Sequence, residues 1–227
     1  MAIVREELPG PAEEVYPASL IAIRELLRLT EPNNPWLEML DGDLELFREN
    51  HQVTQTLFYT NMGTLPDTVI HVSADQDPWI NGCLNNLIWL GQVAGKKITP
   101  RTYGLPLWGA LASAALCPRC HREYMSRHRL VIMAATAWAL DAVPRLLLEV
   151  GPEATARRSI EWADDPDCKA ILEQVERLVA AQNIEITKEN LITWPRAKCP
   201  ACGSILGTRS WTVEGSPLRL NAGQVGE

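Results

Sequence analysis

Two Cys-Pro-x-Cys motifs constrain the fold of this chain more than any other feature. They are Cys117–Cys120 and Cys199–Cys202, and 78 residues (121–198) separate them. Each motif places two sulfurs on one tight turn, and two such turns together supply the four thiolates of a tetrahedral zinc site. Because a set of four cysteine ligands leaves no coordination position open, we expect one structural Zn²⁺ and no catalysis at this site. The intervening chain must leave the site and return, so the spacing predicts a folded insertion.

Two other interpretations of the four cysteines remain open. They could be reduced, buried thiols without a metal. They could also form a redox dithiol, since Cys-Pro-x-Cys resembles a glutaredoxin-type motif, which needs a strand before it and a helix after it. A helix is expected after Cys120, which would meet half of this requirement. The residues after Cys202 (Gly-Ser-Ile-Leu-Gly) are typical of a hairpin instead.

The remaining histidines and cysteines offer weaker ligand candidates. His121 and His128 lie close to the first motif, but the thiolate set is complete without them, and we expect both on a helix surface. Cys83 and Cys168 have no partner at ligand spacing. Each lies in a helical pattern, which predicts a small buried hydrophobic residue.

The composition is that of a globular protein with an ordinary apolar content. The chain has 227 residues, 46% of them hydrophobic, which is enough for one large or two small domains. No uninterrupted apolar run reaches about 18 residues, so no membrane span and no membrane partner are expected. The first residues lack the pattern of a signal peptide, and zinc-type cysteine pairs without one predict a cytoplasmic protein. Most of the eight Trp residues are expected in the core.

The charge distribution is uneven along the chain. Residues 1–80 carry 14 acidic and 4 basic side chains, whereas residues 81–130 carry 7 basic and 1 acidic side chain. Some of these cations would offset the charge of about −2 on a zinc ion bound by four thiolates. The others would suit a phosphate backbone, which makes RNA or DNA an expected partner. The candidate nucleic-acid contacts are Lys96, Lys97, Arg101, Arg119, Arg122, Arg127, Arg129 and Lys198, with Arg196 flanking the second motif.

The periodicity predicts a mainly helical chain with a small β zinc-ribbon-like module, an α+β fold whose two Cys-x-x-Cys motifs are joined across a helical insertion. Helices are expected over 12–30, 34 to about 59, 78–95 and 122–149, the last bent or broken at Pro144, and again from Asp165. Residues 67–73 are expected to form a strand, 184–194 to be extended, and 204–213 to form a hairpin.

Three parts of the chain follow from this pattern. Residues 1–103 form an acidic, mostly helical N-terminal part. Residues 104–214 form the zinc module, with its helical insertion at about 122–183. Residues 215–227 have few apolar anchors and are expected to form a flexible tail.

The sequence contains no motif that indicates an enzyme. It lacks a glycine-rich phosphate loop, a nucleophile elbow and a His-Glu-x-x-His motif. Two acidic groups, Asp75 with Asp77 and Asp164 with Asp165 and Asp167, could bind a divalent cation, but both precede a proline or a helix and are better explained as helix caps.

A zinc motif split by a helical insertion, in a small Trp-rich chain, resembles the large subunits of multi-protein CRISPR effector complexes, and at this length the short large subunit of type IV systems. The resemblance rests on the four cysteines, the chain length and the basic neighbourhood. It implies a non-catalytic subunit at one end of a guide-RNA complex, which contacts the 5′ end of the guide and a short duplex motif beside the target. Of the site residues, it carries over only Cys117, Cys120, Cys199 and Cys202, as metal ligands.

The sequence therefore predicts a binding subunit rather than an enzyme, with other protein subunits and RNA or DNA as partners. A zinc-stabilised adaptor that binds only protein is the first alternative, and a dithiol oxidoreductase is the second.

Overall fold

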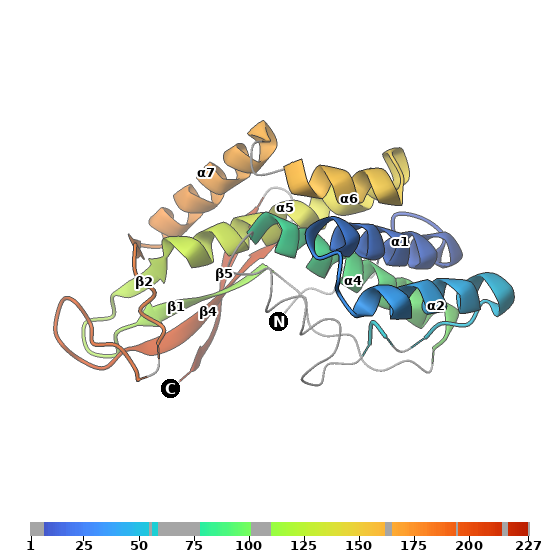
Figure 1. The fold of residues 1–227 in the computed structure, drawn as a ribbon. Helices are drawn as coiled ribbons and strands as arrows, with labels where there is room; N and C mark the ends of the chain where they lie inside the picture. Colours follow the sequence, from blue (N-terminus) through green and yellow to red (C-terminus); the bar gives the residue numbers. More distant parts are fainter. Residues whose placement is uncertain are drawn as a thin grey trace. The chain divides into compact units, whose positions relative to one another are not determined.

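The computed structural model describes residues 7–54, 56–58, 78–100, 110–161, 165–193, 195–214 and 218–226. The chain forms two compact units. The first, called the sheet unit here, contains Leu107–Ala137 and Asp165–Glu227, and the second, the helical unit, contains Arg5–Pro106 and Trp138–Asp164. The elements appear in Figure 1. Most described residues are helical and one small sheet is present, which confirms the mainly α fold with a small β module.

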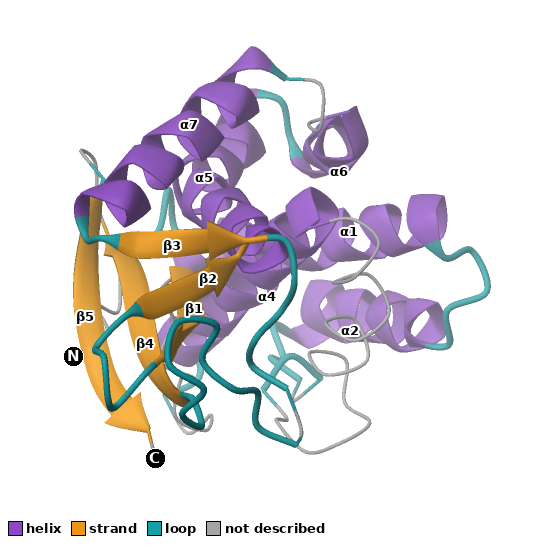
Figure 2. Ribbon diagram, turned by 90° about the vertical axis from the view of Figure 1, so that its left-hand side faces the viewer, coloured by secondary structure: helices purple, strands orange, loops and turns teal. Residues whose placement is uncertain are grey.

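The sheet unit is organised around five strands in the order β3-β2-β1-β4-β5. These are β1 (Ala110–Leu116), β2 (Glu123–Ser126), β3 (Ile184–Thr187), β4 (Gly207–Glu214) and β5 (Arg219–Gly226). Strand β1 pairs antiparallel with both β2 and β4, and β4 pairs antiparallel with β5. β3 and β5 are therefore the edge strands of the sheet, as Figure 2 shows.

The predicted insertion is a helical connection between two neighbouring parallel strands. Strands β2 and β3 run parallel, with Glu123 opposite Ile184. Parallel neighbours cannot be joined by a tight turn and need a long crossover. The crossover consists of α5 (Arg127–Glu149), α6 (Pro152–Glu161) and α7 (Pro166–Ala181). Helix α7 returns the chain to the sheet unit, where it packs against β3 and β5.

Strand β1 is unusually rich in alanine, and the sheet explains why. Ala112 and Ala114 are buried on the face of β1 that Glu123 shares, because side chains alternate along a strand. The Glu123 carboxylate reaches across β1 to β4, where it accepts hydrogen bonds from Arg209 (2.6 Å) and from the indole N–H of Trp211 (2.9 Å). Small side chains on β1 leave room for this partly buried bridge, which joins β2 to β4 across β1.

In the helical unit, α1 (Ala12–Thr30) packs against α2 (Trp36–Asn50), α4 (Pro78–Ile98) and α6, and α4 also packs against α6. Helix α4 is buried along almost its whole length, and the buried set includes the polar side chains of Asn81, Asn85, Asn86 and Gln92. Two of its glycines allow close contacts: a Cβ on Gly91 would lie 2.5 Å from Leu57, and one on Gly95 would lie 2.8 Å from Phe58. The 56–58 segment can therefore lie directly against the helix.

Helix α5 contributes Arg127–Ala137 to the sheet unit and the rest to the helical unit. By length and composition alone it is apolar enough to cross a membrane, with a mean hydropathy of 1.5 over its most apolar window. A core helix of a soluble protein passes the same test, and 61% of that window is buried inside the structure.

Several sequence expectations are confirmed. A helix covers 12–30, and another begins at Pro78. Asn34 accepts a hydrogen bond from the backbone of Trp36 at the start of α2, and Asp165 caps α7 by accepting from the Asp167 N–H. Four of the five Trp side chains whose surroundings the structure describes are buried: Trp79, Trp89, Trp138 and Trp211. The expected strand at 67–73, and Asp75 and Asp77, lie outside the described residues.

Other expectations about local structure are wrong. Residues 123–126 form β2, so the helix expected from 122 begins only at Arg127. That helix continues through Pro144 without a break, because buried Val143 and Leu146 hold the turns around it in the core. Helix α2 ends at Asn50 rather than near residue 59, since His51 adopts a left-handed conformation (φ 55°) that closes the helix.

The C-terminal region also differs from the expectation. Residues 207–214 do not pair within a 204–213 hairpin but form the long strand β4 between β1 and β5. The tail expected to be flexible contains β5, which is paired with β4 from Arg219 to Gly226. Part of the predicted insertion, Trp138–Asp164, belongs to the helical unit.

Candidate metal centre

The register of β1 and β4 explains how two motifs so far apart in sequence meet. Leu116, the last residue of β1, pairs with Gly207, the first residue of β4. Cys117 follows β1 directly, and the second motif ends a few residues before β4. Lys198 and Ile205, on the two sides of this motif, form an isolated β-bridge. Since the strands are antiparallel, the end of one and the start of the other lie at the same edge of the sheet.

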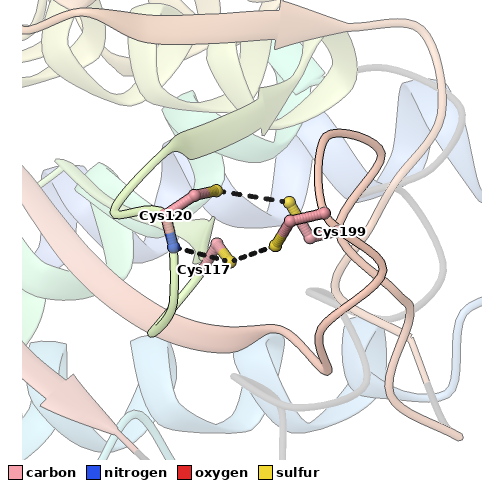
Figure 3. Close-up of side chains that lie close together, drawn as sticks. Cys117, Cys120 and Cys199 are labelled. Carbon is pink, nitrogen blue, oxygen red and sulfur yellow. Dashed lines mark hydrogen bonds between the residues drawn. The ribbon is translucent and has the colours of Figure 1, made fainter.

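The four cysteine sulfurs form one compact group. All four lie within 4.8 Å of one another. Across the two turns, Cys117 Sγ lies 3.4 Å from Cys202 Sγ, and Cys120 Sγ lies 3.7 Å from Cys199 Sγ. Figure 3 shows Cys117 and Cys120 on one turn, facing Cys199 on the opposite loop. A tetrahedral ion with metal–sulfur bonds of about 2.3 Å, as for zinc, requires sulfurs about 3.8 Å apart. The four thiols therefore fit around one ion.

The two turns have the same backbone hydrogen bonds although their sequences differ. In each, the first cysteine N–H donates to the carbonyl five residues later: Cys117 to Arg122 (2.9 Å) and Cys199 to Ser204 (2.7 Å). In each, the fourth residue after that cysteine donates back to its carbonyl and has a positive φ. These residues are His121 (φ 57°) and Gly203 (φ 73°). The matching turns and the small sheet define a zinc-ribbon-like module.

Side chains beneath the sulfurs bury the site on one side. Ala115, Tyr124 and Leu206 form a buried cluster with Cys117 and Cys199. Half-buried apolar side chains complete it: Leu191, Ile192 and Ala197, together with Cys120 and Cys202. Exclusion of water from one side of a thiolate set strengthens its interaction with a cation.

Tyr124 makes a hydrogen bond to one of the thiols. Its hydroxyl lies 3.4 Å from Cys199 Sγ, and both groups are buried. This hydrogen bond is the main reason that the pKa of Cys199 is lowered to about 6, and also the main reason that the pKa of Tyr124 is raised to about 12. When Cys199 is ionised the Tyr124 hydroxyl donates this hydrogen bond, because a thiolate can only accept.

The other thiols have different surroundings. The Ser204 hydroxyl, 3.5 Å from Cys202 Sγ, is the main cause of a lowered pKa at Cys202. The pKa of Cys120 is raised to about 11: the backbone of Arg122 lowers it, but the neighbouring thiols, Cys117 first, raise it more. The four thiols therefore differ in the groups that stabilise their ionised forms.

Replacing Tyr124 by phenylalanine tests the contribution of this hydrogen bond. Partners that hydrogen-bond to metal ligands typically contribute 10–100-fold in metal affinity. We therefore expect Tyr124→Phe to weaken metal binding about tenfold, measured by competition with a chromophoric chelator, with little change in the folded metal-bound state. Tyr16→Phe is the matched control, because Tyr16 is equally buried but donates to or accepts from Thr54 in the helical unit. Equal metal affinity in the two variants would contradict this role.

The structure brings only part of the predicted cationic set to the cysteines. Arg119 and Arg122 are exposed on the first turn, and Arg196 and Lys198 lie exposed beside the second. Arg127 forms an ion pair with Glu176, and Arg129 is half-buried with its backbone N–H bonded to Ser126. Lys96 and Lys97 end α4 in the helical unit, and Arg101 lies outside the described residues.

The weaker ligand candidates are not part of the site. Cys83 and Cys168 are buried helical residues, as predicted, and burial raises the pKa of Cys168 to about 12. His121 is exposed on the first turn itself rather than on a helix, which corrects the prediction, whereas His128 lies exposed in the first turn of α5. Sequence reasoning missed Tyr124, because residues after 122 were assigned to a helix. The only signal available was an aromatic residue four positions after the motif.

No protein-family model, curated protein or solved structure matches this chain. Its function is therefore argued from the residues themselves.

Proposed function

We propose that this protein is a non-catalytic, zinc-stabilised subunit of a nucleic-acid-associated complex. The observation that carries the proposal is the set of solvent-accessible cations on and beside the two cysteine turns. Arg119, Arg122, Arg196 and Lys198 come from segments about 80 residues apart, and the shared metal site holds these segments together. Zinc is the ion that four thiolates in tetrahedral spacing favour in a reducing compartment, so a cytoplasmic location belongs to the same proposal.

A zinc ion would give these cations a fixed geometry. Zinc bound by four thiolates carries a charge of about −2, which one or two nearby cations offset. The others remain available to bind phosphate oxygens. Loops on a rigid support are favoured positions for binding residues, and these cations lie on or beside short turns fixed by backbone hydrogen bonds.

The resemblance to the large subunit of type IV CRISPR effector complexes suggests one nucleic-acid-associated complex to which the protein would belong. Within it, guide RNA and target DNA would be the nucleic acids, and the other protein subunits would be the partners. The four cysteines support this extension through their arrangement, whereas the cationic residues support only the general proposal of phosphate binding.

The two alternatives differ in how well they suit the geometry. A dithiol oxidoreductase needs a helix after its motif, but β2 follows Cys120 and β4 follows the second motif. An adaptor that binds only protein fits the same metal centre. It differs from the proposal in one measurable property, which is retention on nucleic acid.

Nucleic-acid binding is tested by replacing the four cations together. We expect the wild-type protein to bind a mixed-sequence RNA or a DNA duplex at low salt. The Arg119→Ala, Arg122→Ala, Arg196→Ala, Lys198→Ala variant should bind at least about tenfold more weakly, with a salt slope lower by about 0.7–0.9 per lost phosphate contact. Fluorescence anisotropy over a salt series measures both quantities.

A matched control removes the same charge elsewhere. Arg48, Arg158, Lys169 and Arg219 lie outside the two cysteine turns and are accessible to solvent. Replacing these four by alanine should leave binding within about twofold of wild type. Equal losses of nucleic-acid affinity in the two variants would show that net charge alone explains the effect. Absence of binding by the wild-type protein would favour the protein-only adaptor.

A further inference from the structure

Strand β3 has one side that no strand of the described chain occupies. It pairs only with β2, and it is the terminal strand of the sheet. In a parallel pair, alternate residues direct their backbone groups away from the partner strand. Among the described residues, no backbone hydrogen bond outside the sheet involves Ile184–Thr187. An unpaired strand edge of this kind is a template for another strand.

A groove runs beside this edge. Its volume is about 430 Å³, and one face of α7 and the side chain of Ile186 line it. The helix contributes Glu173, Glu176, Arg177 and Ala180, which are spaced three and four residues apart and so share one face. The opposite face of α7 is turned to the core through Val175 and Val179. Figure 2 shows α7 alongside β3.

The groove contains an apolar side chain, that of Ile186, which is partly exposed to solvent. Ile184 and Ile186 point to the same side of β3, but Ile184 is 4% exposed and Ile186 is 37% exposed. A single apolar side chain inserted between Ile186 and Ala180 would cover both. An added strand would carry such a side chain at the position beside Ile186.

The charge at the strand edge indicates a basic occupant. Within the groove Glu173 and Arg177 offset each other and Glu176 is paired with Arg127, whereas Glu185, on the other side of β3, is exposed and forms no ion pair in the described chain. On an added strand, the residue beside Glu185 would face the same side as that carboxylate, where a lysine or arginine is favoured. The same carboxylate disfavours phosphate. A second copy of β3 is also disfavoured, because a two-fold pairing brings two Glu185 side chains into one short ladder.

We propose that the edge of β3 and the groove beside α7 bind an extended segment of a partner protein in which apolar and basic residues alternate. The segment adds a strand to the sheet, places an apolar side chain against Ile186 and pairs a basic side chain with Glu185. This interaction surface is independent of the cations on the cysteine turns, so it holds whether or not nucleic acid binds.

The test uses the full-length protein and a short fluorescent peptide of alternating valine and lysine. We expect saturable binding by anisotropy. Methylation of alternate backbone nitrogens, which removes the strand donors but keeps the charge, should weaken binding at least about tenfold. A peptide of alternating valine and glutamate should fail to bind. Because the whole protein is acidic, with a formal charge of −7, the methylated peptide is the decisive comparison.

Protein variants locate the contact. Ile186→Lys and Glu185→Lys should each weaken binding at least about tenfold. Glu38→Lys, on the surface of α2, makes the same charge change as Glu185→Lys and should leave peptide binding within about twofold of wild type. Absence of binding, equal binding of the methylated peptide, or equal effects of the three variants would overturn the proposal. Concentration-dependent dimerisation that Ile186→Lys abolishes would overturn it in favour of a second copy.

Discussion

Replacing Cys199 by serine should remove the metal ion and unfold the sheet unit around it. The two turns belong to segments about 80 residues apart, which the sheet, the apolar cluster beneath the sulfurs and a bound ion would hold together. Structural zinc contributes directly to folding, with apparent binding free energies of about 10–16 kcal/mol in zinc-finger peptides. If the ion is lost with this ligand, the free-energy cost should equal most or all of the stability of a typical domain, which is about 5–15 kcal/mol.

Metal content by atomic emission and thermal unfolding by circular dichroism measure this effect. We expect one zinc per wild-type chain and none in Cys199→Ser, with a cooperative transition that is lost or lowered by tens of degrees. A strong chelator should reproduce the change in the wild type. Cys168→Ala is the matched control, because it also removes a buried cysteine but should keep the full metal content. A Cys199→Ser variant that keeps its metal would contradict a four-cysteine site.

Replacing Glu123 by alanine should be clearly destabilising, although Glu123 is not a candidate metal ligand. Its carboxylate, 11% exposed, accepts from Arg209 and from the Trp211 indole. Without it, a partly buried cation and a buried N–H lose their partner at the same time. Breaking a fully buried ion pair costs about 3–5 kcal/mol, and because the Arg209 side chain is 30% exposed, we expect about 2–3 kcal/mol here.

Chemical denaturation of the metal-bound protein measures this difference in the free energy of unfolding. Glu185→Ala provides the comparison, since Glu185 is also a strand glutamate but is exposed and forms no ion pair in the described chain. It should change stability by less than about 0.5 kcal/mol. If Glu123→Ala is equally mild, the bridge across β1 contributes nothing, and the alanines of that strand need another explanation.

The candidate site was more predictable than the fold that supports it. The four ligands follow from residue type and spacing, because only a few side chains bind a metal and two sulfurs on one turn already form half a shell. The helices of the N-terminal part follow from periodicity and from caps such as Asn34, as α7 follows from Asp165. These signals lie within a few residues of one another, so they do not depend on tertiary contacts.

The strands of the sheet unit were the least predictable part. β1 is rich in alanine, which has low strand propensity, and only its position beneath the Glu123 bridge favours small side chains there. β2 has four residues and runs directly into α5, so its pattern merges with that of the helix. β5 becomes a strand because β4 offers it an edge.

The sequence by itself indicated the four candidate metal ligands, the helical character of the chain and the need for a folded connection between the two motifs. Only the tertiary structure decided which cations lie beside the cysteine cluster without an acidic partner, because Arg127 is paired with Glu176. It also decided where the edge of β3 lies. Ligand chemistry is encoded in residue types a few positions apart, whereas charge pairing and strand order depend on contacts between residues that the chain brings together only when it folds.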